Sequence, residues 1–271
     1  MAVYDCVQYF NEDHILDLRF NILDKYVDYF VISESTKTHQ GQNKKLNFDI
    51  KNFTKFKDKI HYLIIDDVPI NVKSKKKNWS PNHWRDQHQR NAIARGFQNC
   101  VDDDLIMISD IDEIPNPKKM SEFKINNKYA CFMQKNFQSK LNLLNITDKY
   151  WMGTKICQKK FLKSPQWLRE IKTKKRPFWK FYKPKEPQII LDGGWHFSFL
   201  KKPKDIAKKI KVYSHQEFHK GEFIDEEKIA MRIEKKQDLF NRNFEYKKIE
   251  IDESYPKYIL DNKMTLKDWI I

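Results

Sequence analysis

The segment 104–115, DLIMISDIDEIP, constrains the fold of this chain more than any other stretch. Its apolar run 105–108 is typical of a buried strand in a parallel sheet. Three carboxylates follow within four residues, Asp110, Asp112 and Glu113, and then Pro115 ends the extended segment. Because ligands of open α/β sheets bind outside the carboxyl ends of the strands, this acidic cluster stands where such a fold does its chemistry.

The acidic cluster has the spacing of a metal site. Asp110 and Asp112 project to the same side if the chain stays extended between them. Neighbouring carboxylates repel each other unless a cation lies between them, and Mg²⁺ or Mn²⁺ with oxygen ligands commonly bridges to substrate phosphates. The pattern therefore predicts a metal–diphosphate site at these two residues; a solvated acidic turn is the alternative.

The first 110 residues alternate apolar strands with helical patterns. We expect strands at 3–10, 28–33 and 60–66 before the 104–115 segment, and helices at 11–25, capped by Asn11, and at 82–98. This order predicts parallel strands joined by crossover helices. It is typical of a Rossmann-like nucleotide-binding half with helices on both faces of the sheet.

The second half has a different pattern. Strand-like segments at 129–138 and 155–162 are expected to pair antiparallel, and a strand at 188–192 runs into the GGWHFSF segment at 193–199. Helices are expected at 204–213 and 225–240. No repeat or linker divides the chain, so we expect one α/β domain, with a nucleotide-binding half at about 1–115 and an antiparallel, acceptor-side half at about 116–271.

Composition restricts the partners of the protein. With 52 basic and 37 acidic residues the formal net charge is +15, which favours nucleotide phosphates, nucleic acid or an acidic membrane surface. The four cysteines have no CxxC spacing, so a zinc site is not expected. No signal peptide or membrane-spanning run is visible. We therefore expect a cytoplasmic protein that makes peripheral contact with the inner face of the membrane.

Several polar residues outside the acidic cluster are candidates for the site. Glu34 ends the second strand and is placed to accept hydrogen bonds from a nucleoside, with a turn carboxylate as the alternative. Gln87, Arg90 and Asn91 share one helix face through their i, i+3 and i+4 spacing. That face is either a contact for base, ribose or phosphate, or a solvated surface.

His196 follows a double glycine and lies between Trp195 and Phe197. Strand alternation sends the two rings to one side and the imidazole to the other, so His196 is expected to face the acidic cluster and to contact the metal or a phosphate. A packed core histidine is the alternative. A weaker polar group, His215 with Glu217 and Asp225, lies near a helix end.

The basic, aromatic loop 172–185, KTKKRPFWKFYKPK, has a composition that suits backbone phosphates and stacked bases. It suits a sugar-phosphate or glycolipid acceptor equally well. No nucleic-acid-binding motif accompanies it in the sequence, so nucleic acid is not expected as the partner.

Four motifs together resemble glycosyltransferase family 17. They are VISES at 31–35 with Gly41 downstream, ISDIDEIP at 108–115, GWHFS at 194–198 and PKY at 256–258. Their combination and order are far more specific than any one of them. The resemblance implies a GT-A-like fold, a UDP-linked donor that is expected to be UDP-GlcNAc, a glycan or glycolipid acceptor, Mn²⁺ or Mg²⁺, and inversion at the anomeric carbon.

The resemblance also implies roles for individual residues. Asp110 and Asp112 become the DxD pair that binds metal and diphosphate, Glu34 a donor-site residue, and His196 a late-chain histidine near the metal. Trp195 beside it is placed with the donor-binding residues.

The expected mechanism is direct displacement, in which a carboxylate deprotonates the acceptor hydroxyl. Glu113 is the nearest candidate base, although its place beside the metal is also that of a residue supporting the ligands. Glu217 and Asp225 are the alternatives, and the sequence does not decide among the three.

Two other functions compete with sugar transfer. A nucleotidyltransferase would normally carry an early glycine-rich phosphate loop, and the first 30 residues contain no glycine. A non-enzymatic, basic nucleic-acid-binding protein would match the charge and the 172–185 loop, and would bind in a salt-sensitive way.

Overall fold

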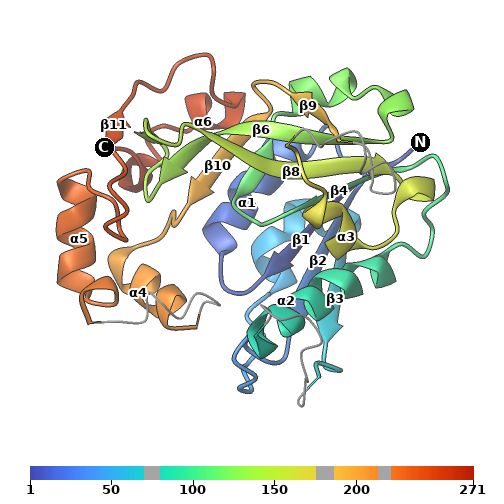
Figure 1. Ribbon diagram of the computed structural model, residues 1–271, viewed down its shortest axis with the longest axis horizontal. Coiled ribbons are helices and arrows are strands. Elements are labelled where there is room, and N and C mark those ends of the chain that lie inside the picture. Colours follow the sequence, from blue (N-terminus) through green and yellow to red (C-terminus); the bar gives the residue numbers. More distant parts are fainter. Residues whose placement is uncertain (70–79, 175–185, 213–220) are drawn as a thin grey trace.

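A computed structural model describes residues 1–69, 80–174, 186–212 and 221–271 and shows one curled, mixed sheet that joins both halves of the chain (Figure 1). The strand order is β11-β7-β6-β8-β4-β1-β2-β3, and β5, β9 and β10 attach beside β6. Helices lie on both faces of the sheet. Within the described ranges, every helix is too short or too polar to cross a membrane.

The strands are β1 (Val3–Tyr9), β2 (Tyr29–Ser35), β3 (Ile60–Ile65), β4 (Leu105–Ser109), β5 (Glu113–Pro115), β6 (Tyr129–Gln138), β7 (Leu143–Asn145), β8 (Tyr150–Gln158), β9 (Gln188–Ile190), β10 (Gly194–Ser198) and β11 (Tyr246–Lys248). The α-helices are α1 (Asp13–Leu23), α2 (Pro81–Ala92), α3 (Pro165–Glu170), α4 (Pro203–Val212), α5 (Glu226–Glu234) and α6 (Lys257–Asp261). Among the 3₁₀ segments, η1 (Ile50–Lys59) precedes β3 and η2 (Ile93–Gly96) continues α2.

The first half is parallel, as the alternation of strands and helices predicted. β4, β1, β2 and β3 lie side by side with parallel register. Tyr9 lies opposite Glu34, and Val7 lies opposite Ser109. The carboxyl ends of three strands therefore meet at one edge of the sheet, next to the turn that follows β4.

The second half extends the sheet in antiparallel fashion. β8 pairs antiparallel with both β4 and β6, and β7 and β11 continue the extension. This pairing of the 129–138 segment with the next strand was predicted, but that strand is Tyr150–Gln158, earlier than expected. β9 and β10 both run parallel to β6, and β10 also pairs antiparallel with the short β5.

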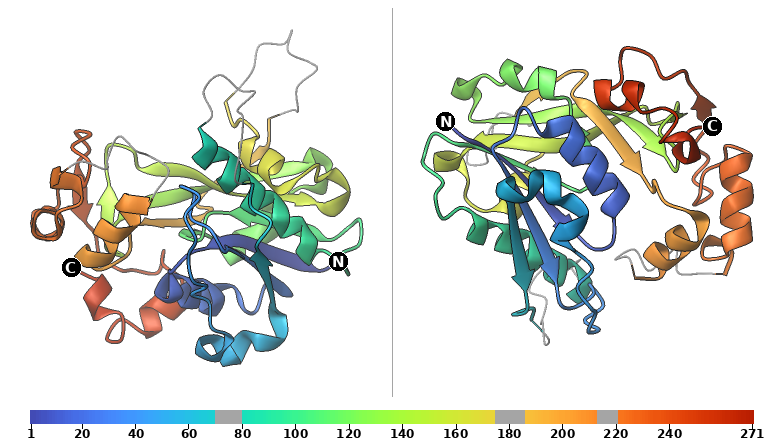
Figure 2. Two further views of the ribbon diagram at one scale, coloured as in Figure 1. Left: turned by 90° about the horizontal axis from the view of Figure 1, so that it is seen from below. Right: turned by 180° about the vertical axis from the view of Figure 1, so that it is seen from behind.

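Two apolar clusters fill the opposite faces of the sheet. α1 and η1 cover one face, where Phe20, Phe53 and Phe56 pack on the strands. η2 and α3 cover the other face through Ile93 and Leu168. A third cluster joins α4 and α5, which stand at the end of the molecule remote from β3 (Figure 2). The helices on both faces agree with the Rossmann-like half that the sequence predicted.

Three local predictions were wrong. The residue before the first helix is Glu12, not Asn11, and its carboxylate caps nothing in the helix. The second half of the expected helix 225–240 is not helical, because α5 ends at Glu234. The chain between β4 and β5 turns instead of staying extended, so Asp110 and Asp112 do not lie side by side on one strand face.

Candidate active site

A pocket of about 560 Å³ opens at the carboxyl ends of β1 and β4, within the size range of small-molecule sites. Four of the residues predicted from the sequence line it: Arg90, Asp110, Asp112 and His196. Further lining residues come from both halves of the chain: Gln8, Tyr9, Glu12, His39, His83, Asp86, Gln89, Asn136, Gln138, Asn145, Asp148, Trp151, Phe199, Lys209, Phe240, Arg242, Phe244 and Tyr246.

Asp110 begins the acidic turn and binds two arginines. Arg90 Nη2 lies 3.2 Å from Asp110 Oδ1, and Arg169 Nη2 lies 2.9 Å from Asp110 Oδ2. Burial works against ionisation of this carboxyl, but the guanidinium groups of Arg169 and Arg90 outweigh it and hold the pKa of Asp110 well below its usual range. The side chain remains 42% exposed towards the pocket, so an ionised Asp110 is available to a ligand.

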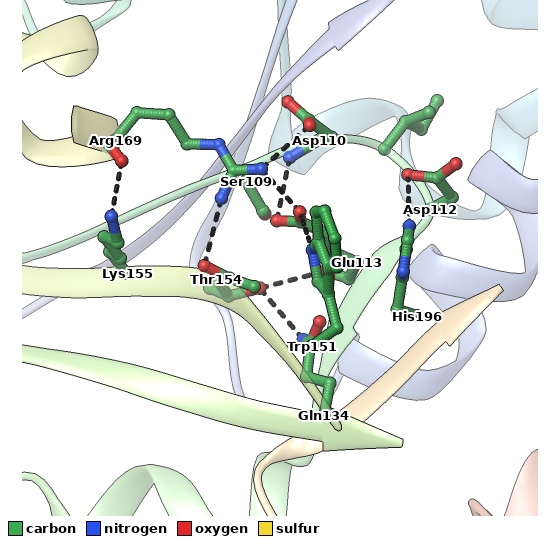
Figure 3. A network of polar contacts seen from close by, with 12 residues as sticks. Ser109, Asp110, Asp112, Glu113, Gln134, Trp151, Thr154, Lys155, Arg169 and His196 are labelled. Carbon is green, nitrogen blue, oxygen red and sulfur yellow. Dashed lines mark hydrogen bonds and ion pairs between the residues drawn. The ribbon is translucent and has the colours of Figure 1, made fainter. Parts of the chain in front are cut away.

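Glu113 supports this turn through buried hydrogen bonds and does not line the pocket. It is fully buried, and its Oε1 accepts hydrogen bonds from Arg169 Nη2 (2.5 Å) and Trp151 Nε1 (2.6 Å) (Figure 3). Burial raises the pKa of Glu113, more than Arg169 lowers it. The contacts are those of a residue that supports the turn, which was the alternative to its role as the base.

Arg19, on α1, holds the same turn from behind. Its fully buried guanidinium forms a paired contact with Asp5, at 2.6 Å to each carboxylate oxygen. It also donates to Ser109 Oγ (2.6 Å) and to the carbonyl oxygens of Ile111 (3.3 Å) and Glu113 (2.8 Å). An arginine on the apolar face of a predicted helix was the sequence signal for this role, and the sequence reasoning missed it.

His196 faces the acidic turn, as strand alternation predicted. Trp195 and Phe197 are buried in the core, and the imidazole points into the pocket. His196 Nε2 lies 3.8 Å from Asp112 Oδ1, and the Trp151 ring stacks on the imidazole with centroids 4.7 Å apart. Figure 3 shows the Asp112 carboxylate and the His196 imidazole facing each other.

The contact between Asp112 and His196 suits a cation. His196 Nδ1 is 3.1 Å from Asn136 Oδ1, so the tautomer protonated on Nδ1 donates there. In the neutral imidazole Nε2 presents a lone pair to Asp112 Oδ1, so that two acceptors face each other across 3.8 Å. Residues 1–69, 80–174, 186–212 and 221–271 contain no group of three or more His, Cys, Asp or Glu arranged for a metal. Hard divalent cations, however, are commonly held by one or two carboxylates plus substrate phosphates and water, and Asp112, with His196 beside it, would supply the protein's share of such a site.

Lysines from the second half add positive charge beside Asp112. Lys209 Nζ lies 4.0 Å from Asp112 Oδ2 and 3.4 Å from Glu12 Oε1, and Lys201 Nζ lies 3.7 Å from the same Glu12 oxygen. Burial opposes ionisation of Glu12, but these two lysines and the backbone N–H groups of Asn11 and Phe10 lower its pKa to about 2. Glu12 therefore anchors α4 to the loop between β1 and α1.

Glu34 lies at the predicted edge but does not line the pocket. It is fully buried, and it accepts hydrogen bonds from the backbone N–H groups of Asn47 (2.8 Å) and Phe48 (3.1 Å) and from the Tyr62 hydroxyl (2.8 Å). Lys44 completes its contacts with an ion pair. These contacts organise the loop after β2, so a direct contact with a nucleoside stays a prediction.

Four further predicted residues do not line the pocket. Asn91 Oδ1 accepts from the Gln166 backbone N–H, Gln87 is partly buried, and Trp195 packs in the core. Asp225 caps α5 by accepting from two backbone N–H groups at 3.0 and 3.1 Å. Glu217, His215 and most of the 172–185 loop lie outside the described residues.

One face of α2 lines the pocket, which explains why a helix packed on the sheet is so polar. Asp86, Gln89 and Arg90 face the pocket, and Arg90 Nη1 also donates to Gln166 Oε1 at 2.6 Å. The apolar packing is left to η2. Of the predicted face of this helix, Arg90 lines the pocket but Gln87 and Asn91 do not, and Asp86 and Gln89 were not predicted. Arg169 was not predicted either, because α3 carries no motif.

Comparison with known proteins identifies the family. The model of glycosyltransferase family 17 matches residues 1–253. The human protein named β-1,4-mannosyl-glycoprotein 4-β-N-acetylglucosaminyltransferase is 24% identical over 251 residues, which is 82% of this chain and 45% of that protein. The rat protein of the same name is 30% identical over 118 residues, 42% of this chain and 21% of its own length.

The chain spans about half the length of the curated relatives that it matches over most of its own length. No solved structure matches it significantly. The matched span covers the acidic turn, His196 and the strands that position them. The chain belongs to glycosyltransferase family 17.

Proposed function

We propose that this protein is a metal-dependent, inverting glycosyltransferase of GT-A type that transfers GlcNAc from UDP-GlcNAc to a hydroxyl group of a glycan or glycolipid. The family match favours sugar transfer over nucleotidyl transfer and over nucleic-acid binding. The names of the human and rat relatives suggest the donor sugar and suggest a β-mannosyl unit as the acceptor to try first.

The arrangement of Asp112 and His196 carries this proposal. Their facing oxygen and nitrogen atoms, 3.8 Å apart, lie in a pocket at the carboxyl edge of the parallel strands. Arg90 and Lys209 line the same pocket. The negative charge of a nucleoside diphosphate must be balanced from several sides. A cation bound by Asp112 and His196 would do so together with the basic side chains of Arg90 and Lys209.

The residues divide the work of binding and orientation. Asp112 and His196 would hold the divalent cation, which when bound supplies positive charge next to the leaving diphosphate. Asn136 and Trp151 fix the imidazole in the required tautomer and plane. The acceptor oxygen attacks C1 from the face opposite the diphosphate, the C1–O bond to UDP breaks with its electron pair on UDP, and a carboxylate receives the acceptor proton.

Calorimetry of UDP binding tests the metal site. We expect UDP to bind the wild-type protein at least tenfold more tightly with Mn²⁺ than with a chelator, because the Asp112–His196 pair needs a cation before a diphosphate can approach. Asp112→Asn should lose this difference while keeping the melting temperature.

The matched control is Asp102→Asn, an exposed aspartate before β4 at the opposite end of that strand, which should keep the Mn²⁺ effect. Equal affinity of the wild-type protein for UDP in Mn²⁺ and in chelator would contradict metal dependence. Release of UDP from UDP-GlcNAc in the presence of p-nitrophenyl β-mannoside tests the transfer itself.

A further inference from the structure

The pocket extends beyond the acidic turn to a second wall. This wall consists of the turn between β7 and β8, which contains Asp148, and the aromatic segment 240–246. The two parts are tied together, since the Glu245 N–H donates to Thr147 Oγ1 at 3.0 Å and the Ile146 N–H donates to the Glu245 carbonyl at 2.9 Å. The residues of the acidic turn, described above, do not belong to this wall.

Five carboxylates line the pocket within the described residues, and four of them have cationic neighbours. The four are Glu12 with Lys201 and Lys209, Asp86 with Arg90, Asp110 with Arg90 and Arg169, and Asp112 with Lys209. A carboxylate held by a guanidinium or ammonium group is a weak proton acceptor, because the ion pair favours its ionised form.

Asp148 carries the fifth carboxylate, and its two side-chain oxygens make no hydrogen bond or ion pair with any residue in the described ranges. Its backbone, in contrast, is fixed. Asn145 Oδ1 accepts from the N–H groups of Thr147 (3.0 Å) and Asp148 (2.8 Å), and Asn136 Nδ2 donates to the Asp148 carbonyl (3.0 Å). The same Asn136 amide contacts His196, so the turn that carries Asp148 lies one side chain away from the expected cation site.

We propose that Asp148 is the general base of the transfer reaction and that the surrounding wall receives the acceptor sugar; this inference rests on the proposed function. A base must be accessible, ionised and free to accept a new hydrogen bond in a plausible substrate position. Asp148 is exposed, lines the pocket and stands on a fixed backbone. Glu113 is buried and hydrogen-bonded, and Asp225 caps a helix away from the pocket.

The composition of the wall suits a sugar. Phe240, Phe244 and Tyr246 line the pocket, and apolar surfaces with a few fixed polar groups are typical of small-molecule sites. Arg242 lies over the rings of Phe240 (5.0 Å) and Phe244 (4.6 Å), and its charge is paired with Asp238 at 2.7 Å. Arg242 thus covers one face of two of these rings, and its charge is balanced by Asp238, so the wall offers aromatic side chains whose neighbouring arginine is already neutralised.

In the proposed step the Asp148 carboxylate takes the proton of an acceptor hydroxyl. The hydroxyl oxygen forms the new bond to C1 of the donor sugar, and the bond from C1 to the diphosphate oxygen breaks. UDP leaves with the electron pair, and the protonated Asp148 later returns its proton to water. No oxidant or further reactant is needed.

The substitution Asp148→Asn tests this role, because the amide keeps the size of the side chain and removes its basicity. We expect kcat for UDP release with p-nitrophenyl β-mannoside to fall at least about 100-fold, the usual minimum for loss of a general base. The affinity for UDP with Mn²⁺ should stay within about twofold of wild type, and the melting temperature should not change. Asp148→Glu should recover part of the activity.

The control Asp102→Asn should keep wild-type kcat, since that exposed carboxylate lies at the far end of β4. An Asp148→Asn protein that keeps a third or more of wild-type kcat would overturn the assignment. So would a loss of UDP affinity equal to the loss of kcat, because that would place Asp148 in the donor site. A wild-type protein that binds UDP but never turns over UDP-GlcNAc would instead refute the proposed function, and this inference with it.

Discussion

At the scale of the residue, Glu12 shows how one buried carboxylate organises both halves of the chain. Its Oε2 accepts from the backbone N–H groups of Phe10 (3.1 Å) and Asn11 (3.0 Å), and its Oε1 faces Lys201 and Lys209. These partners stabilise the ionised carboxylate of Glu12 and not its protonated form. Its contribution to stability therefore depends on pH.

Glu12→Gln should lower the free energy of unfolding by up to about 3 kcal/mol at pH 7. The carboxyl has a pKa of about 2 in the folded protein and an ordinary value of 4.5 in the unfolded chain. The stabilisation is therefore complete above about pH 4.5 and is lost as the pH falls towards 2. Urea unfolding should show the difference between wild type and variant shrinking by about 1 kcal/mol between pH 7 and pH 3.5.

The exposed Glu250→Gln is the matched control and should change stability by less than about 0.5 kcal/mol. A constant difference between wild type and Glu12→Gln across this pH range would show that the ion pairs contribute nothing.

At the scale of the element, α1 determines where the acidic turn lies. Arg19 extends from the buried face of this helix to the carbonyl groups of the turn, and its charge is matched by Asp5 on β1. The helix, the first strand and the turn after β4 are thus fixed by one side chain. The sequence predicted these three elements from local patterns, but not the contact that joins them.

Arg19→Met should destabilise the protein by about 3–5 kcal/mol in urea unfolding, because it leaves Asp5 buried without its partner. The double variant Asp5→Asn with Arg19→Met should recover part of this loss, since it removes the unpaired charge. Lys25→Met, an exposed position just beyond α1, is the control and should be nearly neutral. If Arg19→Met were as stable as wild type, the buried pair would have no role in holding the turn.

At the scale of the whole molecule, the sequence predicts those parts of the fold that follow from short-range patterns along the chain. The parallel first half follows from the alternation of apolar strands and amphipathic helices, and the side of β10 that His196 occupies follows from period-two alternation. The second half could not be ordered in this way, because β9 and β10 join β6 across long connections.

The same distinction explains the candidate site. Asp110, Asp112 and His196 carry their signal in short motifs, and the structure brings them into one pocket. Glu34 has an equally good motif, but loop residues after β2 occupy its carboxylate. Asp148 stands in a turn with no motif at all, and only the folding of β7 and β8 against the segment 240–246 brings it to the pocket.

The amide of Asn136 holds His196 with its oxygen and the turn of Asp148 with its nitrogen. One planar group thus joins the proposed cation site and the proposed acceptor site, and linkage requires any energetic coupling between them to be reciprocal. The dissociation constant of Mn²⁺ should fall on addition of p-nitrophenyl β-mannoside, and that of the mannoside should fall by the same factor on addition of Mn²⁺. Asn136→Ala should make the two binding events independent, and equal coupling in the variant would show that this amide transmits nothing. Such cooperativity would strengthen metal binding, and with it donor binding, when the acceptor is present, and so limit the wasteful hydrolysis of the donor.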